Sequence, residues 1–76
     1  DAYFKEIYKN RVLCEAHAIT MDQYRQSIED TLEDLIQAPI SGQEFVKSLR
    51  DMTKYHLIDQ QQVSRCGQRY RQIKNM

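Results

Sequence analysis

The chain has 76 residues and a formal charge of zero, because eleven acidic side chains balance eleven basic ones. A chain of this length forms at most one domain and buries only about 60% of its unfolded surface, so we expect a marginally stable fold that a partner, a disulfide or oligomerisation would support. The balanced charge argues against a general polyanion binder, and no apolar run approaches the roughly 20 residues of a membrane-spanning helix.

The first predicted element is a helix over residues 2–17. Its apolar residues recur at helical spacing along one stripe: Phe4, Ile7, Tyr8 and Val12. Basic and acidic residues alternate on the remaining surface, which is typical of a solvated face.

A second helix is predicted over residues 21–37, because Thr20 and Gln23 have the spacing of a capping box. One apolar stripe follows it: Met21, Tyr24, Ile28, Leu32, Leu35 and Ile36. Its opposite side is acidic, with five carboxylates against one arginine, or −4: Asp22, Glu29, Asp30, Glu33 and Asp34 against Arg25. Two interpretations stay open, a solvated face that serves solubility and contact with a basic surface on a partner or on this chain's own tail.

A third helix is predicted over residues 42–57. Pro39 stops the preceding helix because it lacks an amide hydrogen, and Ser41 with Glu44 has the spacing of another capping box. The apolar face of this helix consists of Phe45, Val46, Leu49 and Met52.

The last helix is predicted over residues 60–74, with Asp59 as its N-cap. Its apolar stripe consists of Val63, Cys66, Tyr70 and Ile73, and four basic residues against Asp59 give it a charge of +3: Arg65, Arg69, Arg71 and Lys74. Gly67 costs about 1 kcal/mol relative to alanine inside a helix, so we expect it to mark a close helix–helix approach or a bend.

These patterns predict an all-α fold, a small bundle of four short helices that forms a single domain over residues 1–76. The predicted core joins the second and third helices, with mutual burial of Ile28, Leu32, Leu35, Phe45, Leu49 and Met52. We find no internal repeat, heptad run or low-complexity segment.

The two cysteines, Cys14 and Cys66, lie near opposite ends of the chain. A disulfide between them would stabilise the fold by roughly 4 kcal/mol in the chain-entropy description, whereas in a reducing compartment both would be small apolar packing residues. With His17 and His56 they also make four potential zinc ligands, but they lack the short paired spacing of zinc motifs. No arrangement for nucleophilic catalysis is present, so we expect no metal, no cofactor and no enzymatic activity.

The segment 62–72 interleaves arginines with glutamines and a tyrosine, residue types that contact bases and phosphates. It lacks the second helix of a helix-turn-helix, and the neutral total charge is unfavourable for nucleic-acid binding. Solvated or partner-facing arginines are the favoured interpretation.

Two sequence motifs resemble motifs in the domains of phycobilisome linker polypeptides. The first is Tyr3-Phe4-Lys5-Glu6-Ile7-Tyr8-Lys9-Asn10, followed by Leu13 and Glu15. The second begins with Ile40-Ser41, continues as Glu44-Phe45-Val46-Lys47-Ser48-Leu49 and ends with Tyr55. Linker domains have both motifs in this order, with the second motif at the start of their central helix. This chain matches about the first half of such a domain.

The resemblance implies a non-enzymatic structural linker that organises a larger assembly by contacting phycobiliprotein subunits. It also implies a thylakoid-associated location on the cytoplasmic or plastid stromal side. The partner contacts expected from the matching central helix are Phe45, Lys47 and Tyr55, and Arg65 and Arg69 are added for their charge alone. A small helical protein-binding module of another system, and a nucleic-acid-binding domain that uses the basic last helix, remain open.

Overall fold

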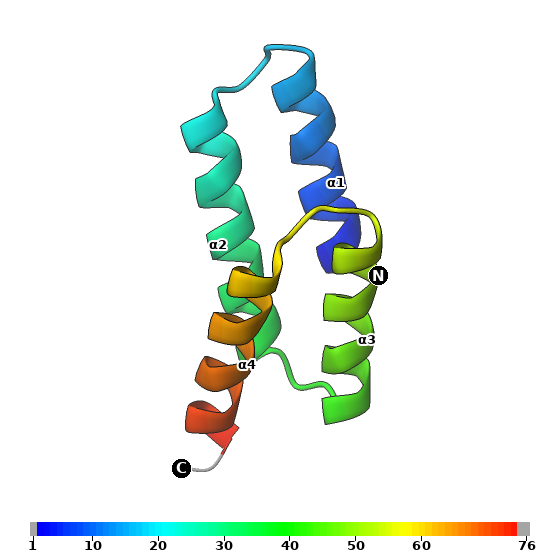
Figure 1. Cartoon of the computed structure of the whole chain (residues 1–76), viewed down its shortest axis with the longest axis vertical. Helices are drawn as coiled ribbons and strands as arrows, with labels where there is room; N and C mark the ends of the chain where they lie inside the picture. The colour runs from blue at the N-terminus through cyan, green and yellow to red at the C-terminus, as the bar shows by residue number, and fades with distance from the viewer. Residues whose placement is uncertain (1, 75–76) are drawn as a thin grey trace.

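The computed structural model describes residues 2–74, which form four α-helices and no strand (Figure 1). The helices are α1 (Ala2–Glu15), α2 (Met21–Gln37), α3 (Gly42–Lys54) and α4 (Gln60–Lys74). The all-α prediction is confirmed, and α2 and α4 have the predicted bounds. The first and third helices are shorter than predicted, since they end at Glu15 rather than residue 17 and at Lys54 rather than residue 57.

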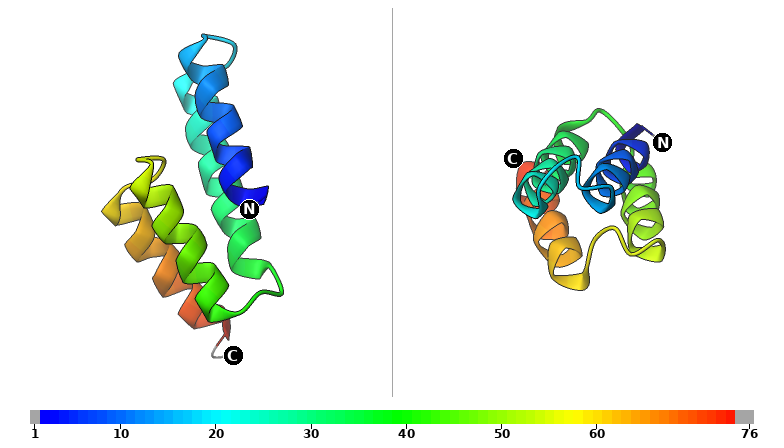
Figure 2. Two further views of the ribbon diagram at one scale, coloured as in Figure 1. Left: turned by 90° about the vertical axis from the view of Figure 1, so that its right-hand side faces the viewer. Right: turned by 90° about the horizontal axis from the view of Figure 1, so that it is seen from above.

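The fold consists of two antiparallel helical hairpins, α1–α2 and α3–α4, packed side by side (Figures 1 and 2). Across the hairpins, α1 contacts α3 and α2 contacts α4. The segment that joins them contains Ala38, whose extended backbone (φ −66°, ψ 144°) is the conformation that a following proline favours. The α1–α2 hairpin extends beyond α3–α4 at its loop end, which gives the molecule an elongated shape of 40 × 21 × 19 Å.

The early ends of α1 and α3 have one cause, a histidine in the left-handed backbone region. His17 has φ 62° and His56 has φ 59°. After α3, the His56 amide donates to the Thr53 carbonyl (3.0 Å) and the Leu57 amide to the Met52 carbonyl (2.8 Å). These two bonds are the Schellman motif, which satisfies the last carbonyls and ends the helix. The same pair ends α1: the His17 amide donates to Cys14 (3.0 Å) and the Ala18 amide to Leu13 (2.8 Å).

The connection between α3 and α4 has the same sequence pattern as the connection between α1 and α2, 39 positions earlier. The prediction that the chain has no internal repeat was therefore wrong. Both connections read His, any residue, Ile, an N-cap, two residues and Gln. Each ends in a reciprocal capping box, made by Thr20 with Gln23 (2.8 and 3.1 Å) and by Asp59 with Gln62 (both 2.8 Å). Ser41 caps α3 through one such bond, accepted from the Glu44 amide at 3.2 Å.

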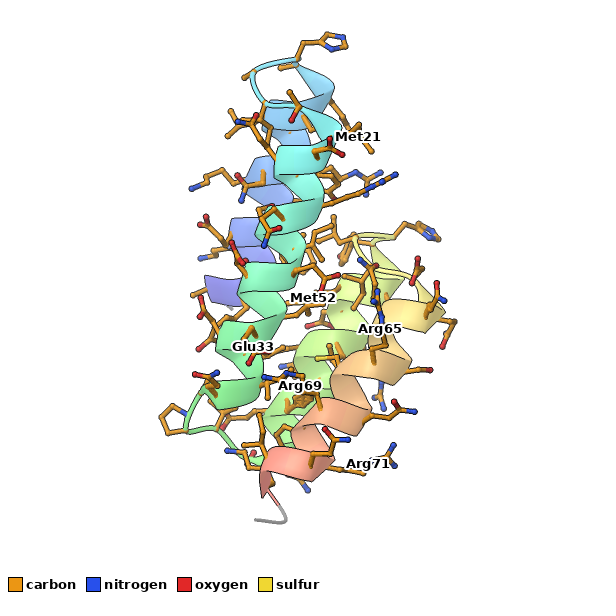
Figure 3. All side chains as sticks on the ribbon, turned by 90° about the vertical axis from the view of Figure 1, so that its left-hand side faces the viewer. Met21, Glu33, Met52, Arg65, Arg69 and Arg71 are labelled. Atoms are coloured by element: carbon orange, nitrogen blue, oxygen red, sulfur yellow. The ribbon has the colours of Figure 1, made fainter. Side chains whose placement is uncertain are left out.

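The core lies between the hairpins, and all six residues predicted to be mutually buried belong to it. Residues of α1, of the α3–α4 connection and of α4 complete the cluster: Ile7, Ile36, Leu57, Ile58 and Cys66. The predicted stripe of the first helix is wrong beyond Ile7, because Tyr8 and Val12 are half exposed, as is Met21 at the start of α2. Met21 lies in the part of the α1–α2 hairpin that extends beyond α3–α4, which explains its exposure (Figure 3).

Candidate functional site

An open groove with a volume of about 1220 Å³ lies between α3 and α4. All its lining residues come from these two helices. Its base holds the rings of Phe45 and Tyr70, which stack at a centroid distance of 4.1 Å and an interplanar angle of 11°. Val46 of α3, which is 52% exposed, and the partly exposed Val63 of α4 add apolar surface, whereas Phe45 and Leu49 are buried. The groove therefore presents apolar side chains to solvent.

The rim of the groove is positively charged on both sides. Lys47, Arg50 and Lys54 line it from α3, and Arg71 lines it from α4, whereas none of its described lining residues is acidic. The whole chain is neutral, so positive charge is concentrated here. A concave apolar wall focuses the field of such charges and attracts anionic groups.

Gly67 lines the same groove from α4. A Cβ atom at this position would meet no atom within 4 Å outside its own helix turn, so no neighbouring helix requires the glycine. The close helix–helix approach that we expected from the sequence is therefore wrong for this chain. The glycine instead leaves the α4 wall without a side chain at the middle of the groove.

The predicted partner residues of the third helix fall on two different surfaces. Phe45 lies at the base of the groove, where it is only 2% exposed and belongs to the core, and Lys47 lies on the rim. Tyr55 lies outside the groove, at the C-cap of α3, where its ring and that of Phe4 pack edge to face with centroids 5.3 Å apart. Arg11 of α1 donates to the Tyr55 carbonyl at 2.9 Å, so this residue joins the two hairpins.

Arg65 and Arg69, the other two predicted partner residues, contact α2 within the chain (Figure 3). Arg69 binds Glu33 with two hydrogen bonds, from Nε to Oε2 at 2.8 Å and from Nη2 to Oε1 at 2.6 Å. Arg65 Nη2 lies 3.8 Å from Glu29 Oε1. Of the interpretations left open for the acidic face, contact with the chain's own basic helix is confirmed for these two glutamates.

The ion pair changes the acidity of Glu33. The hydrogen bond from Arg69, followed by that from Gln37, lowers the pKa of the Glu33 carboxyl from 4.5 to about 2. The same bond raises the pKa of the Arg69 guanidinium. Because the two side chains are 54% and 35% exposed, salt screens the pair and its contribution to stability is modest.

Both cysteines are free thiols, so the structure does not contain the possible disulfide between them. Cys66 is buried in α4, and burial, with smaller contributions from Glu33 and Glu29, raises the pKa of its thiol to about 11. Cys14 is partly exposed in α1, with its Sγ 3.3 Å from Met21 Sδ. Within residues 2–74, no three His, Cys, Asp or Glu side chains are grouped so that they could hold a metal ion.

Sequence reasoning missed most of the groove, although part of its signal is visible. Lys47, Arg50 and Lys54 recur three and four positions apart, which places a basic stripe beside the apolar stripe of α3. The contribution of α4, from Val63, Gly67, Tyr70 and Arg71, has no comparable signal because it depends on how the two helices face each other.

No protein-family model, curated protein or solved structure matches the chain. Among the described residues, no helix has both the length and the apolar character that crossing a bilayer requires.

Proposed function

We propose that the chain is a non-enzymatic protein-binding module that organises a larger assembly, and that its partner docks in the groove between α3 and α4. The observation that carries this proposal is the combination of an open apolar base with basic residues on both rims. Covering the exposed Val46 and its apolar neighbours would contribute about 25 cal/mol per Å² removed from water. A docked partner would also stabilise this small bundle by mass action.

A phycobilisome linker is the specific form of this proposal. Phe45 and Lys47, which match the central helix of linker domains, both line the groove, and this placement supports a phycobiliprotein as the partner. On this proposal the module would work at the thylakoid surface. Tyr55 would contribute indirectly, because it joins α3 to α1.

Nucleic-acid binding through the last helix is the alternative that the structure makes less favourable. Arg65 and Arg69 lie close to Glu29 and Glu33, which compensate their charge. The remaining arginine of that segment, Arg71, lies on the rim of an apolar groove, and phosphate groups gain nothing from an apolar base.

A pull-down with a matched pair of charge reversals tests the linker proposal. Tagged parent, Lys47→Glu and Arg25→Glu are mixed with a phycobilisome lysate and, separately, with duplex DNA across a salt series. Both substitutions change the net charge equally at exposed helix positions, but only Lys47 lines the groove. Coloured phycobiliprotein captured by the parent and the Arg25→Glu control, and lost with Lys47→Glu, would support the linker. Colourless beads refute it, and a salt-steep DNA shift favours the alternative.

The wider proposal, a protein-binding module of any system, needs a test that does not assume the partner. A photo-crosslinking side chain replaces Val46 in the groove or, as a control, Ala18 in the distant α1–α2 connection. In a lysate of the source cells we expect a discrete protein adduct from position 46 that Lys47→Glu removes. The absence of an adduct specific to position 46 contradicts the proposal.

A further inference from the structure

We infer that the occupant of the groove is an acidic amphipathic α-helix of three to four turns, contributed by a different protein. This inference rests on the proposed protein-binding function and specifies the partner of the same site.

The length of the groove sets the length of its occupant. Its lining extends along α3 from Gly42 to Lys54 and along α4 from Gln60 to Arg71. The thirteen residues of α3 span about 20 Å at 1.5 Å per residue. A helix of about 13 residues fills that distance, whereas an extended peptide of the same span would need only about six residues and would leave the width of the groove unfilled.

The chemistry of the walls sets the sequence pattern of the occupant. An apolar stripe at positions i, i+3, i+4 and i+7 is the pattern by which helices dock in apolar grooves. Here that stripe would cover Val46, Val63 and Tyr70, because Phe45 is already buried within the chain. The flanks of the same helix would face basic residues on both sides, Lys47 and Lys54 on α3 and Arg71 on α4, so glutamates and aspartates suit those flanks.

Gly67 supplies an independent argument for close approach of another backbone. Glycine is among the least favourable residues inside a helix, and nothing within the chain packs against this position. A glycine in the wall of a groove lets a second helix come nearer than any side chain would allow. The position therefore suits a docked helix better than it suits the free protein.

A second copy of this chain does not present a suitable helix. In α2 the apolar residues Ile28, Leu32 and Leu35 are buried, so its acidic side has no accessible apolar stripe. In α1 the exposed Tyr8 lies one turn from both Lys5 and Arg11, which have the same sign of charge as the groove rim. The acidic helix must then come from another protein.

A designed peptide pair tests this inference. The first is a helix-stabilised peptide of about 14 residues, with leucines at three- and four-residue spacing and glutamates on the flanks; the second replaces every glutamate by lysine. We expect the acidic peptide to bind the parent, to shift the amide resonances of Val46, Leu49 and Gly67, and to bind Lys47→Glu about tenfold more weakly or worse. The Arg25→Glu control should keep the parent affinity.

Substitutions at Gly67 separate docking from folding. Gly67→Ala should raise the urea midpoint, because alanine favours the helix, and yet weaken peptide binding. The Cβ atom of Gly67→Leu would meet no neighbour within 4 Å in the free chain, so this variant should stay folded by circular dichroism and bind the peptide at least about tenfold more weakly. If Gly67→Leu keeps the parent affinity, or the lysine peptide binds equally well, the inference is overturned.

Other occupants give distinct results that also overturn it. A concentration-dependent dimer that Gly67→Leu abolishes would assign the groove to a second copy, and binding to anionic phospholipid vesicles that Lys47→Glu abolishes would assign it to a membrane surface. A groove-dependent crosslink at position 46 with no peptide binding would overturn the helical occupant alone. Loss of that crosslink as well would remove the proposed function itself.

Discussion

His17 and His56 occupy a backbone conformation that side chains with a Cβ atom rarely adopt. Helix ends of this kind usually have glycine, because the left-handed region crowds Cβ against the backbone. The histidine side chains are exposed, so no burial of these side chains offsets the energetic cost of that crowding. Each connection therefore holds local strain at a position where nothing in the structure requires a side chain.

We predict that His56→Gly stabilises the protein by about 1 kcal/mol, since glycine relieves the strain at positive φ. His56→Ala is the matched control, because it also removes the imidazole but keeps the Cβ atom. Urea denaturation followed by circular dichroism measures both. A glycine variant no more stable than the alanine variant would show that the conformation is not strained.

The Cys66 thiol should react far more slowly than the partly exposed thiol of Cys14. Burial raises its pKa to about 11, so at pH 8 only about one thousandth of it is thiolate, and the residue is only 4% exposed. In a Cys14→Ser variant, where Cys66 is the remaining thiol, we expect iodoacetamide labelling to be slow in buffer and fast in urea, measured by intact mass. Labelling at equal rates would contradict the packing of α4 on α2.

At the scale of elements, α2 and α4 are joined by the Arg69–Glu33 pair as well as by the core. The pKa of Glu33 is lower in the folded state, so its pair stabilises the fold above about pH 4.5, and that contribution is lost as the pH falls toward 2. We predict that Glu33→Gln is less stable than the parent at pH 7 and that the difference shrinks through this window. Asp34→Asn, an exposed neighbour, should show a smaller difference, and added salt should reduce that of Glu33→Gln.

Helix starts could be predicted from the sequence because their signals are local. Thr20, Ser41 and Asp59 carry side chains that bond the first turn, and each lies at the observed N-cap. The ends of α1 and α3 could not be predicted in the same way, because His17 and His56 replace the glycine that marks a left-handed cap. The repeated connection is visible in the sequence as His-x-Ile followed by a capping box. The pattern indicates a repeated helix–helix connection only when its two copies are compared.

At the scale of the whole molecule, the core connects both hairpins through Leu32, which is 5% exposed. We predict that Leu32→Ala costs about 2–5 kcal/mol, comparable to the total stability of a domain of this size, so that the variant is largely unfolded alone. Val12→Ala, at a site 48% exposed, should cost less than about 1 kcal/mol. Thermal melts of the two variants compare these sites, and similar melting temperatures would mean that Leu32 is not central.

The core could be predicted because apolar periodicity within single helices identifies the faces that must be buried. The groove could not, because it is formed by the outer surfaces of two helices whose relative placement depends on the whole fold. The sequence identified Phe45 and Lys47 as partner residues. Tyr70 and Gly67 line the groove beside them because the α3–α4 hairpin brings the two helices together, which the sequence did not reveal. For Arg65 and Arg69 the sequence suggested a contact that the structure does not need. Their charge suggested an external partner, but they lie next to glutamates of the same chain.

The stacked Phe45–Tyr70 pair gives the molecule a built-in optical reporter. The chain has five tyrosines and no tryptophan, so excitation at wavelengths that phenylalanine does not absorb gives fluorescence from phenol rings alone. Of these five, Tyr70 is the one among the groove's described lining residues. A partner peptide that carries an indole and docks in the groove would accept excitation energy from Tyr70 by resonance energy transfer. The phenol emission would then fall as the indole emission rises. Occupancy of the groove can therefore be followed in real time with unlabelled protein.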